Sequence, residues 1–192
     1  NNYYNLLKII TSPSNYFEKL TIVEGWSKNE LRYILNDFFL DFDDLKYNEI
    51  LADTYYFNYG SSFNDLKINM QKKLKKNKIK YNNHVLLNNF SFDEIIVIGS
   101  LLEKEGLDEF DKKKIFSVII NRLKKNMKLQ IDATVIYALT NGTYHLNRKL
   151  TYNDLKYKHP FNTYFIYGLP PEPISYVGTK TIELIFENYK SD

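Results

Sequence analysis

The chain has 192 residues, of which 44% are hydrophobic and 16% aromatic, values typical of a folded globular protein and not of a disordered one. It contains no cysteine, which excludes a disulfide framework and thiolate chemistry. The net charge of +3 would help the approach of an anionic polymer but does not identify one. No apolar run approaches the ~20 residues that cross a membrane, and no signal peptide is visible.

The first half of the chain predicts short elements joined by polar turns. Ser27 and Glu30 have the spacing of a capping box, in which each side chain satisfies a backbone N–H group at the start of a helix. The elements expected there are an amphipathic segment (3–10), a turn (12–14), a strand (16–23), a helix after Ser27, a second strand (51–59) and a helix after Ser62. Strands alternate irregularly with helices, so an α+β fold is predicted.

A basic run, residues 72–80, follows in the second of these helices. Because it lacks regular aromatic interleaving, a solvated helix face is favoured over a nucleic-acid site. Residues 82–89 then form a linker. We therefore place a domain boundary near residue 85, which gives an N-terminal region (1–85) and a C-terminal domain (86–192).

The segment 91–105, SFDEIIVIGSLLEKE, predicts the central helix of the protein. Ser91 and Glu94 form another capping box, and the apolar residues that follow leave almost no polar face, which is typical of a buried helix. Burying the Glu103 carboxyl group at the end of such a helix is unfavourable unless the group is paired, kept protonated or used in catalysis.

Two readings of Glu103 remain open from this helix alone. Gly99, one turn earlier, costs about 1 kcal/mol relative to alanine and indicates a close approach there. Gly99 and Ser100 would leave open space beside the carboxyl group, which suits a general acid. The alternative is an acid that pairs with Lys104 or Arg122. Glu105, two residues on, points roughly opposite to Glu103, so the two cannot share one site.

Further signals lie beyond the central helix, where Asp108 or Asp111 is expected to begin the next helix. Gln130, Asp132 and Thr134 alternate within an apolar segment, where Asp132 and Thr134 could also simply cap a short helix. Another signal is the segment from Asn162 to Tyr164 with the stiff, proline-rich loop 168–173. It could form one side of a sugar-binding subsite or be an ordinary surface loop. The three histidines fit no metal-binding spacing.

Three motifs in this order resemble those of the endolytic murein transglycosylase family (MltG, YceG-like). They are IGSLLEKE (98–105), INRLKKNMKLQIDATVIYAL (120–139) and FNTYFIYGLPPEPI (161–174). The resemblance is strong over 92–186 and weaker in TIVEGWSKNEL (21–31) and LADTYYFNYG (51–60). It implies a catalytic domain with a smaller N-terminal LysM-like subdomain.

The resemblance also implies an activity, which is cleavage of the MurNAc–GlcNAc β-1,4 bond in nascent peptidoglycan with a 1,6-anhydro end as product. No cofactor is implied, and the expected partners are glycan strands and peptidoglycan synthases, with no nucleic acid. The implied location is the bacterial cell envelope. We expect a fragment whose inner-membrane anchor lies upstream, with the domain outside the cytoplasm, and whose catalytic domain is truncated at its C-terminal end.

The first glutamate of the family motif maps onto Glu103, which is the predicted catalytic residue. A single carboxyl group suffices, because it can protonate the glycosidic oxygen and then take the proton of the C6 hydroxyl group. The residues expected to orient and bind substrate are Glu105, Gln130, Asp132, Thr134, Asn162 and Tyr164.

Three rival functions stay open at this point. One is an inverting muramidase that uses Glu103 and Asp132 as an acid–base pair. Another is a non-catalytic peptidoglycan-binding scaffold, with residues 18–75 as the glycan reader. The last is a nucleic-acid-binding module, whose affinity would fall steeply with salt.

Overall fold

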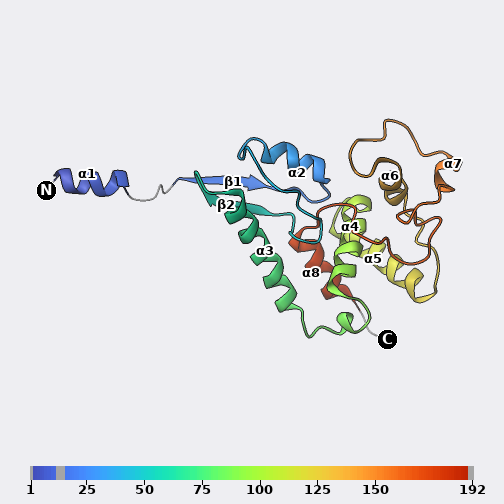
Figure 1. Ribbon diagram of the computed structural model, residues 1–192. Helices are drawn as coiled ribbons and strands as arrows, with labels where there is room; N and C mark the ends of the chain where they lie inside the picture. The colour runs from blue at the N-terminus through green and yellow to red at the C-terminus, as the bar shows by residue number, and fades with distance from the viewer. Residues whose placement is uncertain (1, 12–15, 190–192) are drawn as a thin grey trace.

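The computed structural model describes residues 2–11 and 16–189 of the chain and combines helices with a two-stranded sheet (Figure 1). The predicted α+β content is therefore confirmed. The turn expected at residues 12–14 lies outside the described residues. The elements are α1 (Asn2–Thr11), β1 (Phe17–Thr21), α2 (Lys28–Leu35), β2 (Thr54–Asn58), α3 (Phe63–Lys80), the 3-10 helix η1 (Val85–Asn88), α4 (Phe92–Glu105), α5 (Glu109–Lys124), α6 (Asp132–Thr140), α7 (Tyr152–Leu155) and α8 (Thr179–Asn188).

Helix α4 is the central helix that the sequence predicts, and it packs against both α5 and α8 (Figure 1). The Ser91 hydroxyl group accepts a hydrogen bond from the Glu94 N–H group, and the Glu94 carboxylate accepts one from the Ser91 N–H group. Every residue from Ile95 to Leu102 is buried. The local cap and the continuous apolar run together explain why this segment forms a buried helix.

Gly99 allows the segment before α8 to approach α4 closely. A Cβ atom on Gly99 would lie 2.7 Å from Cγ1 of Val177, which is fully buried. The predicted close approach is thus confirmed, but the expected open space beside Glu103 is wrong. The Val177 side chain occupies the space over Gly99, and the Ser100 hydroxyl group is engaged with the Val97 carbonyl oxygen and the Ile174 N–H group.

The buried apolar residues form two clusters that meet along α3. The N-terminal core gathers around the β1–β2 hairpin and includes Phe63, Leu66 and Met70 of α3. The C-terminal core gathers around α4, α5 and α8 and includes Leu74, one turn further along α3. The C-terminal half of the chain also contributes to the N-terminal core, because Tyr176 is buried there, whereas Val177 belongs to the C-terminal core.

The hairpin pairs β1 with β2 in antiparallel register, from Phe17 opposite Asn58 to Thr21 opposite Thr54. One face of the hairpin covers the N-terminal core, whereas the other is exposed. Beside the hairpin, the Ala52 N–H group donates to the Val177 carbonyl oxygen at 2.8 Å. This bond joins the N-terminal core to the segment that packs on Gly99.

Local details differ from the sequence-based expectation at three places. Helix α2 ends at Leu35, although its apolar spacing predicts a helix that continues to Phe38 and Phe39, and the expected linker contains η1. Asp132 is not the N-cap of α6, because the cap is Ile131 and Asp132 is the first helical residue. The N-cap of α5 is Asp108, which decides between the two residues proposed for that role.

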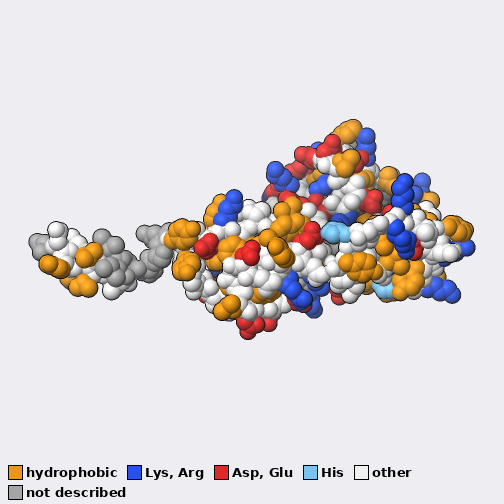
Figure 2. All heavy atoms as spheres, turned by 90° about the horizontal axis from the view of Figure 1, so that it is seen from above, with side chains coloured by type: hydrophobic (Ala, Val, Ile, Leu, Met, Phe, Trp, Pro, Cys, Tyr) orange, Lys and Arg blue, Asp and Glu red, His pale blue; other side chains and the backbone are white. Residues whose placement is uncertain are grey.

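Three of the six lysines in the basic run of α3 form ion pairs with neighbouring elements. Lys73 pairs with Asp53, Lys78 with Asp93 and Lys80 with Glu183. Lysines and arginines are interspersed with acidic residues on the face seen in Figure 2. Among the described helices, none combines the length and hydrophobicity that would let it cross a membrane.

Replacing Gly99 with alanine tests the contact between α4 and Val177. The substitution gains about 1 kcal/mol of helix propensity but overpacks a buried contact, which typically costs about 1–3 kcal/mol. We expect a net decrease of about 1 kcal/mol in the free energy of unfolding, measured by urea denaturation. In a Val177→Ala background, which removes the clashing methyl groups, Gly99→Ala should be neutral or stabilising. An equal cost in both backgrounds would contradict this account.

Candidate active site

Glu103, the predicted catalytic residue, lies in the interior with its side chain only 2% exposed. Its Oε2 atom forms an ion pair with Lys112 of α5, and its Oε1 atom accepts a hydrogen bond from the Gly178 N–H group at 3.0 Å. Lys112 also donates to the Thr181 hydroxyl group of α8 at 3.1 Å. Both carboxylate oxygens are therefore engaged by protein groups, as in the ion-paired reading of this helix, with Lys112 as the partner.

The two basic residues that the sequence suggested as partners of Glu103 bind elsewhere. Lys104 donates to the Gly25 carbonyl oxygen at 3.0 Å and so ties the end of α4 to the turn before α2. Arg122 donates to the carbonyl oxygens of Lys128 and Leu129. Arg122 thereby fixes the extended segment that leads to Gln130.

Glu105 lies on the opposite side of the last turn of α4 and is exposed. Its Oε1 atom accepts a hydrogen bond from the Ala133 N–H group, in the first turn of α6, at 3.2 Å. The backbone thus orients the Glu105 carboxylate, and no basic side chain among residues 2–11 and 16–189 forms an ion pair with it.

Asp132 and Tyr164 lie beside Glu105. The Tyr164 hydroxyl group donates to Asp132 Oδ1 at 2.6 Å. Burial raises the pKa of Tyr164 to about 12, with further increases from Asp132 and Glu105, whereas Arg122 acts in the opposite direction. Tyr164 is therefore a neutral hydrogen-bond donor at physiological pH. We call Glu105, Asp132 and Tyr164 the acid–phenol cluster.

Thr134 and Asn162, predicted to bind substrate, are instead fully buried and contact protein groups. Thr134 shares a hydrogen bond with the Thr163 hydroxyl group at 2.8 Å. The Asn162 amide donates to the carbonyl oxygens of Leu155 and Tyr157, and its oxygen accepts from the Tyr164 N–H group at 2.9 Å. These two side chains therefore position the loop that carries Tyr164.

Gln130 lies in the segment between α5 and α6, is exposed, and has a positive φ of 52°. This conformation is uncommon for a residue other than glycine, and it is maintained here by the Gln130 N–H bond to the Thr163 carbonyl oxygen at 3.1 Å. The Thr163 hydroxyl group also accepts from the Ile131 N–H group at 2.9 Å. Sequence analysis named Thr163 only as part of the segment from Asn162 to Tyr164 and assigned it no role. In the structure it connects the loop that carries Tyr164 to the segment before α6.

A cavity of about 330 Å³ opens between α2 and α6 and reaches Ala133, the residue that binds Glu105. One wall comes from the start of α2, and the other from α6 and the loop after it. No motif or spacing in the sequence predicts that these segments meet. The lining residues are Ser27, Asn29, Glu30, Lys104, Ala133, Ile136, Tyr137, Thr140, Gly142, Thr143, Tyr144, His145, Leu146 and Ile174.

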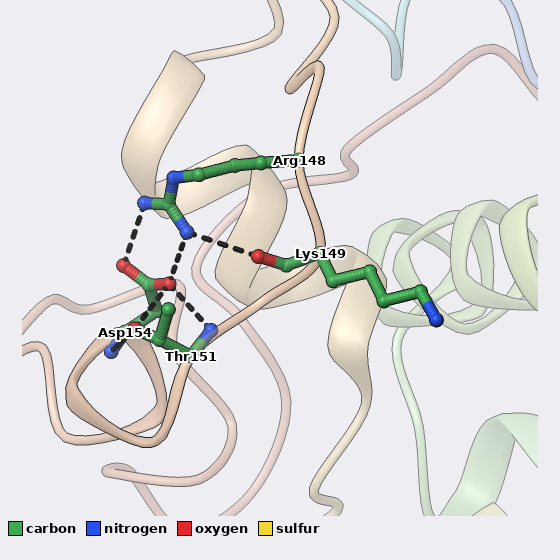
Figure 3. A network of polar contacts seen from close by, with 4 residues as sticks. All are labelled: Arg148, Lys149, Thr151 and Asp154. Atoms are coloured by element: carbon green, nitrogen blue, oxygen red, sulfur yellow. Dashed lines mark hydrogen bonds and ion pairs between the residues drawn. The ribbon is translucent and has the colours of Figure 1, made fainter.

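The loop after α6 is braced by a polar network around Asp154 (Figure 3). Arg148 donates to both carboxylate oxygens of Asp154 and to the Lys149 carbonyl oxygen. Thr151 forms a capping box with Asp154 at the start of α7. The pKa of Asp154 is held well below its usual range, chiefly by Arg148 and then by Thr151. The network links the cavity wall to α7.

The model of the YceG-like family matches residues 1–192. The chain belongs to the YceG-like family. The crystal structure of a YceG-like protein from Listeria monocytogenes has a TM-score of 0.70 and 26% identity, and it covers 100% of this chain and 73% of that chain.

Two curated relatives of this YceG-like chain carry a functional name. The endolytic murein transglycosylases of Bacillus subtilis (strain 168) and Streptococcus pneumoniae serotype 2 (strain D39) are 37% and 31% identical to it over 140 and 142 residues. Each alignment covers 72% of this chain. The matched region spans 38% of the first relative's length and 25% of the second's.

Within residues 2–11 and 16–189, no group of three His, Asp or Glu side chains is arranged to hold a metal ion.

Removing Lys112 tests whether Glu103 is a buried structural charge. Breaking one partner of a buried ion pair leaves an uncompensated charge, so Lys112→Met should lower the free energy of unfolding by about 3–5 kcal/mol. The double variant with Glu103→Gln should recover much of that loss, as measured by urea denaturation. Lys113→Met, which breaks an exposed pair with Glu109, is the matched control and should have little effect. A similarly small effect of Lys112→Met would refute the buried-pair assignment.

The network around Asp154 predicts a local effect of pH and mutation. Because its folded-state pKa is depressed, the contribution of Asp154 is present above the unfolded-state pKa, near 4, and is lost as the pH falls further. Arg148→Ala should therefore increase hydrogen exchange in residues 142–156 at pH 7, and the difference from the parent protein should shrink below pH 4. Exchange in α4 serves as the internal control and should not change.

Proposed function

We propose that this protein is an endolytic peptidoglycan lytic transglycosylase that cleaves the MurNAc–GlcNAc β-1,4 bond and leaves a 1,6-anhydroMurNAc end. Family membership and the names of the two curated relatives support the reaction class. The observation that carries the proposal is the acid–phenol cluster. It places an exposed carboxyl group beside a cavity and next to a neutral phenol donor.

The geometry favours Glu105 over Glu103 as the catalytic acid. A general acid must reach the oxygen that it protonates within hydrogen-bond distance. Both oxygens of Glu103 are engaged in the interior, whereas Glu105 is exposed beside the cavity. We therefore assign proton transfer to Glu105 and a structural role to Glu103, which reverses the roles inferred from the sequence motif.

In the proposed reaction a single carboxyl group acts twice. Protonated Glu105 donates its proton to the glycosidic oxygen as the bond from that oxygen to C1 of MurNAc breaks. The C6 hydroxyl oxygen of the same MurNAc then forms a bond to C1, and its proton passes to the Glu105 carboxylate. The acid is restored and no water is consumed.

Asp132 and Tyr164 support this reaction from beside the acid. Tyr164 holds the Asp132 carboxylate through a short hydrogen bond and remains protonated because its pKa is raised. A carboxylate in this position would stabilise the positive charge that develops at C1, as in other glycosidic cleavages. Gln130, exposed on the adjoining segment, is assigned to hydrogen bonding with the substrate.

Two alternatives make different predictions. An inverting muramidase with Glu103 and Asp132 as its acid–base pair needs both groups at the substrate, and the burial of Glu103 disfavours it. Its product would be heavier by one water, which mass spectrometry distinguishes. A non-catalytic glycan-binding scaffold would capture glycan strands but release no anhydro product from them.

The wider setting of the protein is also proposed. The antiparallel β1–β2 hairpin with α2 between its strands in sequence supports a LysM-like N-terminal subdomain. A lytic transglycosylase of this kind would act at the bacterial cell envelope, outside the inner membrane and anchored to it, beside the synthases that make new glycan strands.

Replacing each glutamate in turn tests the assignment. Glu105→Gln should lower the rate of anhydro-product release from purified glycan strands by about 10²–10⁴-fold, the usual contribution of acid–base catalysis. Its thermal unfolding should stay close to that of the parent protein. Glu103→Gln should lower the unfolding temperature but retain release within about tenfold of the parent rate, since glutamine can still accept from the Gly178 N–H group.

The opposite pattern would restore the motif-based assignment. If folded Glu103→Gln released no product while Glu105→Gln remained active, Glu103 would be the acid and its ion pair with Lys112 would have to open for catalysis. Release of hydrated instead of anhydro ends by the parent protein would support the inverting muramidase. Both readings use the same mass-spectrometric assay.

A further inference from the structure

The cavity between α2 and α6 has the location expected of a sugar subsite rather than of a general surface hollow. Ala133 lies in its wall and binds Glu105, and Lys104, the residue before Glu105, also lines it. A sugar ring in this cavity would therefore lie next to the proposed acid. Its volume of about 330 Å³ is at the lower end of small-molecule sites, ~300–1,000 Å³, and suits one ring better than several.

The cavity wall combines aromatic and aliphatic surface in the way that a pyranose ring requires. Tyr144 is 59% exposed and Ile136 is 37% exposed, and both line the cavity with Tyr137. The Tyr144 hydroxyl group donates to the Leu139 carbonyl oxygen at 3.3 Å, which holds the ring against α6. An aromatic face fixed in this way can pack against the C–H face of a sugar.

The polar lining has no strong preference for one sign of charge. Lys104 and Glu30 bring opposite charges, and each is already engaged, Lys104 with the Gly25 carbonyl oxygen and Glu30 within its capping box. Asn29 adds an amide group and His145 an imidazole group, both able to form hydrogen bonds. Such a lining suits a neutral ligand with hydroxyl and amide groups over a phosphate or a strongly charged peptide.

The N-terminal region supplies one wall of the cavity. Asn29 of α2 donates from its side-chain amide to the Thr143 carbonyl oxygen at 2.7 Å, across the boundary between the two regions. Gly142, beside Thr143, has a φ of +67°, and a Cβ atom there would lie 3.0 Å from the Tyr137 ring. The turn that meets α2 is therefore closely fitted to the aromatic wall.

We propose that this cavity is a subsite for one neutral N-acetylhexosamine ring of the glycan, with Tyr144 as its stacking surface and α2 as its far wall. The subsite rests on the proposed transglycosylase function, because the ring it holds is the one beside Glu105. In this proposal, α2 of the N-terminal region takes part directly in substrate binding.

Binding to a defined probe tests the subsite apart from catalysis. The probe is a β-1,4-linked N-acetylglucosamine tetramer, titrated by calorimetry into the Glu105→Gln protein. Tyr144→Ala in that background should weaken binding about tenfold, as expected for loss of a contact aromatic. Ile136→Trp, which fills the cavity, should weaken it at least as much. Tyr56→Ala, also 59% exposed but on the hairpin, is the matched control and should bind normally.

The outcomes separate the subsite from the reaction. Unchanged affinity in both folded cavity variants, or no binding of the tetramer by the Glu105→Gln protein, overturns the subsite even if the parent protein releases anhydro products. Weakened binding in both variants, with normal binding by Tyr56→Ala, supports the subsite even if the parent protein releases no anhydro product. Thermal unfolding of each variant establishes that it is folded.

Discussion

The ion pair between Glu103 and Lys112 is the interaction on which the arrangement of the site depends. It joins α4 to α5, and the second Glu103 oxygen binds the Gly178 N–H group at the start of α8. The Ala52 N–H group binds the neighbouring Val177 carbonyl oxygen, so the N-terminal core is attached at the same place. A buried pair of this kind is weak evidence of added stability, but losing one partner is costly. Its main effect is therefore to fix which way the last turn of α4 faces.

That orientation explains how two acids only two residues apart can have different roles. A separation of about 200° around a helix sends them to opposite sides. Glu103 points into the junction of α4, α5 and α8, and Glu105 points toward α6. The sequence determines the separation of the two acids. Which of the two acids lies beside the cavity depends on where α6 and the loop around Thr163 pack. The local sequence contains no signal for that packing.

The elements that sequence analysis predicts well are those determined by local interactions. Capping boxes identified the starts of α2 and α4, because their hydrogen bonds join residues three apart. Gly99 correctly indicated a close approach, although not that Val177 would fill the space. Asp132 resembled a cap by position, yet its carboxylate binds Tyr164, 32 residues away. Thr134 and Asn162 are polar motif residues whose burial appears only once the loops are assembled.

The two regions of the chain depend on each other at the site. Lys104 beside the proposed acid binds the Gly25 carbonyl oxygen, and Asn29 binds the Thr143 carbonyl oxygen across the cavity. Tyr176, close to Gly178 in sequence, is buried in the N-terminal core, where its hydroxyl group donates to the Leu45 carbonyl oxygen at 2.7 Å. Because these contacts position the acid, the cavity wall and the start of α8 together, separating the regions near residue 85 would expose both cores and open the cavity. The hydrogen bonds across the boundary predicted near residue 85 therefore connect the two regions at the candidate site.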